Sequence, residues 1–65
     1  MDNEQDFSGF LNIRVALFFD SGRGIERKQG TIKEINETHI TIFEDFSKKD
    51  EALLRSRIVR MEAMR

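Results

Sequence analysis

Apolar residues alternate with other residues through segment 12–20, and this period of two is typical of a β-strand. The residues that share one face of this strand are Ile13, Val15, Leu17 and Phe19. Ala16 and Phe18 make the opposite face half apolar, so we expect that face to be covered as well. The strand is followed by Ser21-Gly22-Arg23-Gly24, where glycine allows the positive φ that a tight reversal needs.

Two further strands follow this reversal. Segment 25–36 contains Gly30, and a glycine inside a strand usually marks a bulge or a sharp bend. Asn36-Glu37-Thr38 predicts a second tight turn, and His39–Phe43 is β-branched and alternating, as a strand requires. Residues 12–43 therefore predict a three-stranded meander.

The two ends of the chain are less uniform in pattern. Residues 1–6 are polar, and we expect them to be flexible. Phe7 and Phe10 are three residues apart and precede Leu11, which predicts one short helical turn resting on the core, with Asp6 as a candidate N-cap. We expect a single domain over residues 7–62, with 63–65 as the C-terminal end.

The last third of the chain fits two structures. Residues 52–55 and 58–62 can form two short strands joined by a turn at Ser56-Arg57, with the charged stretch 44–51 as a loop. The alternative is a C-terminal helix, because Ser47-Lys48-Lys49-Asp50 resembles a capping box and good helix formers follow it. We favour the strands, since a meander must still cover its open edge and face.

The composition argues against an enzyme. The chain has 65 residues, no Cys and one His, so it lacks a cysteine nucleophile and a second histidine for a metal site. Gly22 and Gly24 lack the third glycine and the lysine of a phosphate loop, and we interpret them as turn residues. We expect no catalytic residue, no metal and no cofactor.

The sequence also predicts where the protein is found. The longest apolar run is Val15–Phe19, far short of the roughly 20 residues that cross a bilayer. The first six residues are acidic and lead into no apolar signal segment. We expect a cytoplasmic protein that does not associate with membranes.

This order of elements resembles the Sm-like family of small, five-stranded SH3-like barrels over about residues 7–62. The first signature of that family is matched by Val15–Phe19, by Gly22 or Gly24, by Gly30-Thr31-Ile32 and by Ile35-Asn36. Arg55-Ser56 is the nearest match to the Arg-Gly pair of the second signature, and His39-Ile40 stands where the family has its base-holding Met-Asn pair. The resemblance implies an all-β barrel with a short N-terminal helical turn, and it favours nucleic acid as the partner.

Two segments carry an excess of basic residues, and each is a candidate surface for RNA or DNA phosphates or for a protein partner. The basic residues are Arg23, Arg27, Lys28 and Lys33 in the first segment and Arg55, Arg57 and Arg60 in the second. The same residues can instead be solvated charges that protect strand edges or neutralise the acidic stretch 44–51. The net charge of −1 argues against a constitutively basic module.

His39 and two phenylalanines complete the candidate residues. His39 is expected to be a partly exposed residue hydrogen-bonded to the preceding turn, with contact to a base or partner as the alternative. The six phenylalanines cannot all enter so small a core, and an exposed aromatic ring can stack on a base or form a protein interface. Because the chain has no Tyr or Trp, we favour the interface and expect Phe18 and Phe43 to form it between copies of the chain.

These observations predict a non-enzymatic small barrel that acts as a binding or assembly module, associates with itself and contacts RNA or DNA through its basic patches. The alternative is a protein-interaction or regulatory subunit, a homo-oligomeric adaptor that binds no nucleic acid. The charge balance and the missing base-holding pair support this alternative.

Overall fold

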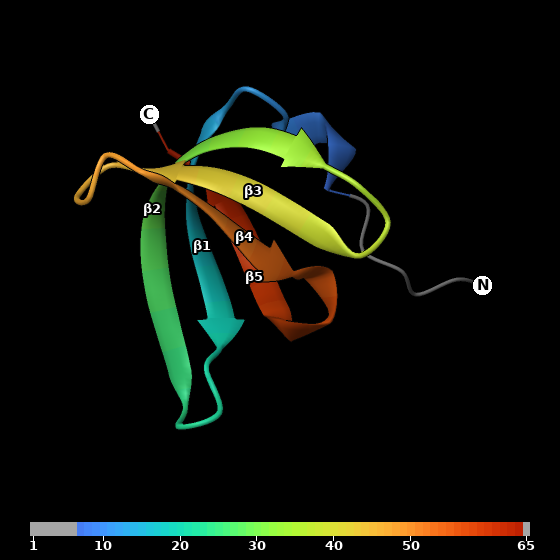
Figure 1. Ribbon diagram of the computed structural model, residues 1–65, viewed down its shortest axis with the longest axis vertical. Helices are drawn as coiled ribbons and strands as arrows, with labels where there is room; N and C mark the ends of the chain where they lie inside the picture. The colour runs from blue at the N-terminus through green and yellow to red at the C-terminus, as the bar shows by residue number, and fades with distance from the viewer. Residues whose placement is uncertain (1–6, 65) are drawn as a thin grey trace.

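The computed structural model describes residues 7–64. Within this range the chain forms five antiparallel strands in one sheet, with strand order β4-β3-β2-β1-β5 (Figure 1). The elements in chain order are the 3-10 turn η1 (Ser8–Phe10), β1 (Arg14–Asp20), β2 (Ile25–Ile35), β3 (His39–Glu44), β4 (Asp50–Leu54), the 3-10 turn η2 (Arg55–Arg57) and β5 (Ile58–Ala63). The expected flexibility of residues 1–6 and the expected N-cap at Asp6 lie outside the described residues.

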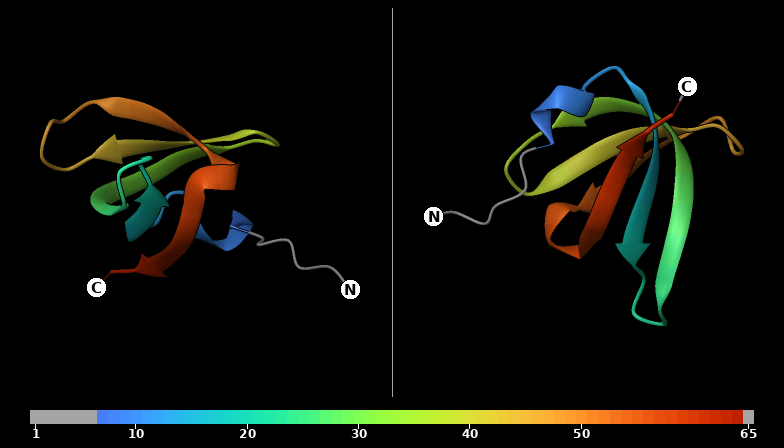
Figure 2. Two further views of the ribbon diagram at one scale, coloured as in Figure 1. Left: turned by 90° about the horizontal axis from the view of Figure 1, so that it is seen from below. Right: turned by 180° about the vertical axis from the view of Figure 1, so that it is seen from behind.

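The meander is confirmed, and β2 holds it together by belonging to two ladders. Residues Ile25–Thr31 of β2 pair with β1, whereas pairing with β3 begins at Gly30 and runs to Ile35. Gly30 and Thr31 are therefore the corner at which β2 leaves one neighbour for the other, and Figure 2 shows the resulting bend.

Gly30 is required at this corner because the two backbones approach closely. A Cβ atom on Gly30 would overlap the main-chain carbonyl of Phe43 and would lie 3.0 Å from the Cα atom of Glu44. Main-chain atoms in a ladder cannot move aside as a flexible side chain can. The expectation that Gly30 marks a bend is therefore confirmed.

The last third of the chain forms the two strands that we favoured, and the C-terminal helix is wrong. β4 pairs with β3 at one edge of the sheet, whereas β5 pairs with β1 at the other. Within residues 7–64 no ladder joins β4 to β5, so the expected barrel is an open sheet with two outer strands. The three residues of η2 carry the chain between these edges instead of forming a hairpin.

Two strands begin two residues away from the start that the sequence predicts. β1 begins at Arg14 and not at residue 12, because Asn12 has a positive φ of 65° that interrupts an extended strand. Ile13 is consequently 40% exposed and lies outside the core. β4 begins at Asp50, within the expected loop, and only residues 45–49 connect it to β3.

The core lies on the inner face of the sheet, which we define as the face that carries Val15 and Leu17. The side chains with no exposed surface are Val15, Leu17, Ile32, Ile40 and Ile42. Phe7 and Phe10 of the N-terminal turn pack against them, as their spacing predicts. Burial of these apolar side chains is the main stabilising contribution in so small a domain. No helix in the described part of the chain is long and apolar enough to cross a membrane.

Candidate functional site: the outer face of β1, β2 and β5

The two basic segments of the sequence meet at Phe18. Phe18 lies in the central strand β1, opposite Arg27 of β2 on one side and Arg60 of β5 on the other. Directly opposed residues of antiparallel strands point to the same face, so all three side chains lie on the outer face. The guanidinium carbon of Arg60 is 4.8 Å from the centre of the Phe18 ring. We call this row Arg27–Phe18–Arg60 the aromatic-arginine row.

A β-bulge in β5 turns Arg60 toward this row. Phe18 pairs with Arg60, whereas the next residue, Phe19, pairs with Ile58, so Val59 is the extra residue. The bulge allows Ile58 to reach the core while Arg60 points outward. A strict alternation of β5 would have placed Ile58 and Arg60 on the same face.

The two arginines of the row differ in their ionic partners. Arg60 Nη2 lies 3.0 Å from Glu62 Oε2, and both side chains are more than half exposed, so this ion pair contributes about 1 kcal/mol or less. Arg27 has no carboxylate partner within residues 7–64. Both guanidinium groups are thus able to bind another anion at low cost.

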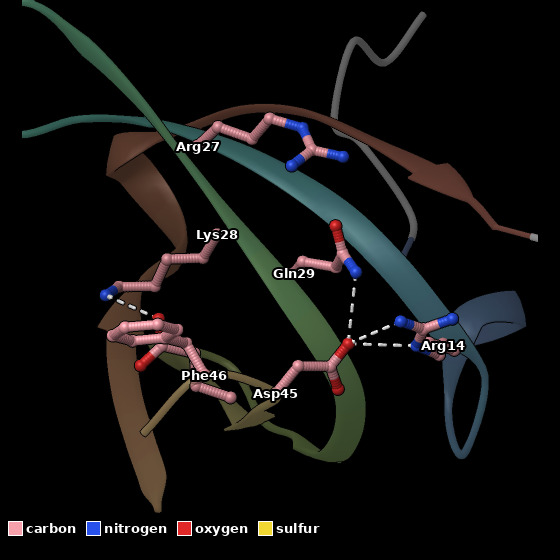
Figure 3. A pocket seen from close by; sticks show the side chains of 7 residues that line it. Arg14, Arg27, Lys28, Gln29, Asp45 and Phe46 are labelled. Carbon is pink, nitrogen blue, oxygen red and sulfur yellow. Dashed lines mark hydrogen bonds and ion pairs between the residues drawn. The ribbon is translucent and has the colours of Figure 1, made fainter. Parts of the chain in front are cut away.

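An open pocket of about 440 Å³ lies beside the row, between β2 and the loop that follows β3. Its lining residues are Arg14, Arg27, Lys28, Gln29, Glu44, Asp45 and Phe46 (Figure 3). Asp45 Oδ2 accepts hydrogen bonds from Arg14 Nε at 2.9 Å, from Arg14 Nη2 at 2.7 Å and from Gln29 Nε2 at 3.2 Å. The bonds from Arg14, and then that from Gln29, hold the pKa of Asp45 below its ordinary value of 3.8.

Lys28 does not share a face with Arg27, although the two are adjacent in sequence. It pairs with Leu17 on the inner face, where its Nζ atom lies 2.9 Å from Glu51 Oε1 and 3.9 Å from Glu44 Oε2. The hydrogen bond to Glu51 outweighs burial and raises the pKa of Lys28 above 10.5. Lys28 thus links β2 to β3 and β4 and is less available to an external phosphate than Arg27.

The remaining basic candidates lie elsewhere. Arg23 is exposed at the tip of the turn between β1 and β2, and Arg57 Nη1 lies 3.4 Å from the carbonyl oxygen of Asp20. Arg55 Nη1 donates to the carbonyl oxygen of Asn36 at 2.9 Å, which ties η2 to the turn between β2 and β3. Lys33 is exposed at the register shift in the second half of β2. The structure therefore does not gather all the basic candidates into one patch.

His39 has the structural environment that its position predicts. Its side chain is half-buried, and its Nδ1 atom lies 2.8 Å from the hydroxyl oxygen of Thr38. Its backbone amide donates to Asn36 Oδ1 at 2.8 Å. His39 is thus part of the turn between β2 and β3, away from the aromatic-arginine row.

Phe18 and Phe43 both lie on the outer face and are half-buried. Phe43 pairs with Thr31 on β2 and with Asp50 on β4, in a different row from Phe18. The most exposed phenylalanine is Phe46, at 93%, which the sequence analysis did not select. Its position within the charged stretch 44–51, outside any alternating segment, was the available signal.

Comparison with protein-family models, curated proteins and solved structures finds no match to this chain. The residues of the site therefore carry the functional argument by themselves. Within residues 7–64 no three His, Asp or Glu side chains converge in a way that could hold a metal ion.

Proposed function

We propose that this chain is a non-enzymatic binding and assembly module that contacts single-stranded RNA or DNA through the aromatic-arginine row. The observation that carries the proposal is that Arg27 and Arg60, from different basic segments, flank one aromatic ring on an exposed face. Guanidinium groups bind phosphates through planar, paired hydrogen bonds, and aromatic rings stack on unpaired bases. A single strand can offer both groups at once.

The order of the elements supports a relationship to Sm-like and other SH3-like barrels, which we include in the proposal. The meander, the corner at Gly30 and the short final strands follow the order of the family signature. The base-holding pair of that family is absent at His39-Ile40. Contact through the aromatic-arginine row is accordingly expected to be insensitive to base sequence, because every base presents a face for stacking.

Self-association is the second part of the proposal. β4 and β5 are outer strands, and unpaired strand edges favour pairing with another chain. Phe43 adds half-buried aromatic surface on the outer face, in a row that leaves Phe18 available to nucleic acid. Sedimentation velocity tests this part: Phe43→Ser, which leaves the aromatic-arginine row intact, should shift the protein toward monomer. A folded variant with an unaltered sedimentation profile would exclude Phe43 from the interface.

The nucleic-acid part is tested by the salt dependence of binding to a single-stranded RNA oligonucleotide. Each phosphate contact contributes a slope of about −0.7 to the plot of log affinity against log salt for single strands. Arg60→Gln should weaken binding and reduce the slope by about 0.7. Lys33→Gln makes the same change of charge away from the row and should leave the slope unchanged. Equal effects of the two variants, or no binding at low salt, would refute the assignment.

A second candidate function is a homo-oligomeric adaptor that binds a protein and no nucleic acid. The observation that favours it is Phe46, because an almost fully exposed aromatic side chain is a common anchor of protein interfaces. Under this alternative, Phe46→Ser should abolish partner binding, while RNA should fail to bind even at low salt.

A further inference from the structure

The first half of β2 has an unpaired edge. Residues Ile25–Thr31 pair with β1, but pairing with β3 starts only at Gly30, where β2 turns the corner. Ile25–Gln29 therefore has a neighbouring strand on one side only within the described residues. Within residues 7–64, the one main-chain hydrogen bond on its other side is donated by the amide of Asp45 to the carbonyl oxygen of Gln29 at 2.9 Å.

The ladder with β1 shows which main-chain groups of this edge are free. The amide of Ser21 donates to the carbonyl of Gly24 at one end, and that of Ile32 donates to Ile13 at the other. In an antiparallel ladder, hydrogen-bonded pairs alternate with non-bonded pairs. Glu26 and Lys28 therefore bond to β1, whereas the amides and carbonyls of Ile25 and Arg27 point away from it.

The side chains around this edge are also available to a partner, because they are exposed or lack an ion pair within residues 7–64. Ile25 is 58% exposed and Phe46 is 93% exposed, whereas Arg27 has no carboxylate partner within residues 7–64. Arg27 and Phe46 line the same open pocket. Figure 3 shows Arg27 on one side of β2, with Phe46 on the other side together with Lys28. An arriving chain would meet a cation on the outer face and an aromatic ring on the inner face.

We propose that the edge Ile25–Lys28 is a docking site for an extended segment of another protein, which adds to the sheet as a strand next to β2. The free amides and carbonyls of Ile25 and Arg27 recur at every second residue, which is the spacing of a polypeptide strand and not of a nucleic acid. Charge complementarity to Arg27 requires an acidic side chain on the outer face of the segment. Contact with Phe46 requires an apolar side chain on the inner face. The segment thus alternates acidic and apolar residues.

This site overlaps the proposed nucleic-acid surface at one residue, Arg27, but the proposal does not depend on nucleic-acid binding. The two share Arg27, but Arg60 belongs only to the aromatic-arginine row and Phe46 belongs only to the docking edge. Arg60→Gln should therefore weaken RNA binding and leave peptide binding unchanged. Phe46→Ser should weaken peptide binding and leave RNA binding unchanged. The two variants therefore distinguish failure of one proposal from failure of the other.

The test uses amide hydrogen exchange, measured by NMR, with a capped ten-residue peptide of alternating Val and Glu as the probe. In the free protein the amides of Ile25 and Arg27 should exchange rapidly, whereas those of Glu26 and Lys28 are protected by β1. Saturation with the peptide should slow exchange at Ile25 and Arg27 at least tenfold. Unchanged exchange at these two amides under saturating peptide would overturn the proposal.

Two peptide controls test the strand geometry. One carries N-methyl groups on all Glu residues and the other on all Val residues, so each presents one methylated edge and one free edge. Because only one edge of the added strand can face β2, one of the two peptides should lose binding and the other should retain it. Equal binding of both peptides would refute strand addition.

Variants of the protein test the side-chain requirements and the competing occupants. Arg27→Glu should weaken peptide binding about tenfold, since an opposite-charge pair becomes a like-charge pair. Lys33→Glu, the matched control away from this edge, should leave binding unaltered. Protection of the Ile25 and Arg27 amides by RNA, or by raising the protein concentration alone, would assign the edge to another occupant and overturn the proposal.

Discussion

Replacement of Gly30 by Ala tests whether the corner in β2 holds the sheet together. The added Cβ atom would overlap the Phe43 carbonyl and approach the Glu44 backbone to 3.0 Å, so β2 and β3 would have to separate. Overpacking of this kind costs about 1–3 kcal/mol, and a lost ladder hydrogen bond adds about 1 kcal/mol. We expect the free energy of unfolding to fall by about 2–4 kcal/mol, a large part of the roughly 3–10 kcal/mol available to a domain of this size.

The measurement is thermal unfolding followed by far-UV circular dichroism, because the chain has no Trp or Tyr for fluorescence. In a domain of 60–100 residues, 1 kcal/mol corresponds to about 4–8 °C in Tm, so Gly30→Ala should lower Tm by about 10 °C or more. Gly9→Ala is the matched control, because a Cβ atom on Gly9 would meet no atom within 4 Å. It should leave Tm unchanged or raise it slightly.

Equal Tm values for Gly30→Ala and Gly9→Ala would refute the role of Gly30 at this corner. That result would mean that β2 does not cross β3 at a distance that excludes a side chain. The β1–β2 and β2–β3 ladders would then have to meet at Gly30 with a wider spacing between the strands.

Three further changes test other parts of the structure. Ile42→Val removes one methylene from a side chain with no exposed surface and should cost about 0.5–1.5 kcal/mol in urea unfolding, so an unaltered midpoint would count against this core. Asn36→Ala removes the acceptor of the Thr38 and His39 amides, at 3.0 and 2.8 Å, and should cost about 1–2 kcal/mol; no loss of stability would argue against this turn. The pKa of the Asp45 carboxyl is lowered below 3.8, so its stabilising contribution is present above that pH and is lost as the pH falls through its folded pKa. Wild type and Asp45→Asn should differ in unfolding free energy at pH 7 and converge in acid, whereas a constant difference would contradict the ion pair with Arg14.

The local features of the fold could be predicted from the sequence. Alternation of apolar residues gives β1 and β3, and glycine and asparagine mark the turns, because strand period and turn conformation depend on near neighbours. The role of Gly30 could be predicted because a close approach of two backbones favours glycine, which has no side chain. It could also be predicted that Arg27 and Lys28 lie on opposite faces of the sheet, because successive side chains of a strand alternate between the two faces.

The long-range arrangement could not be predicted in the same way. Nothing in the local pattern of β5 shows that η2 directs it to β1 and not to β4, because strand pairing depends on the path of the whole chain. The meeting of Arg27 and Arg60 at Phe18 follows from that pairing and from the bulge at Val59. The free edge of β2 likewise follows from the bend at Gly30, which separates β3 from the first half of the strand.

The central functional claim is that nucleic acid contacts the outer face at the aromatic-arginine row. Titration of the isotope-labelled protein with a single-stranded oligouridine, followed by amide chemical shifts, tests it most directly. We expect the largest shifts at Phe18, Arg27 and Arg60, and we expect them to shrink as salt is added. Shifts concentrated around Lys33 and His39, or no shifts at low salt, would contradict the claim.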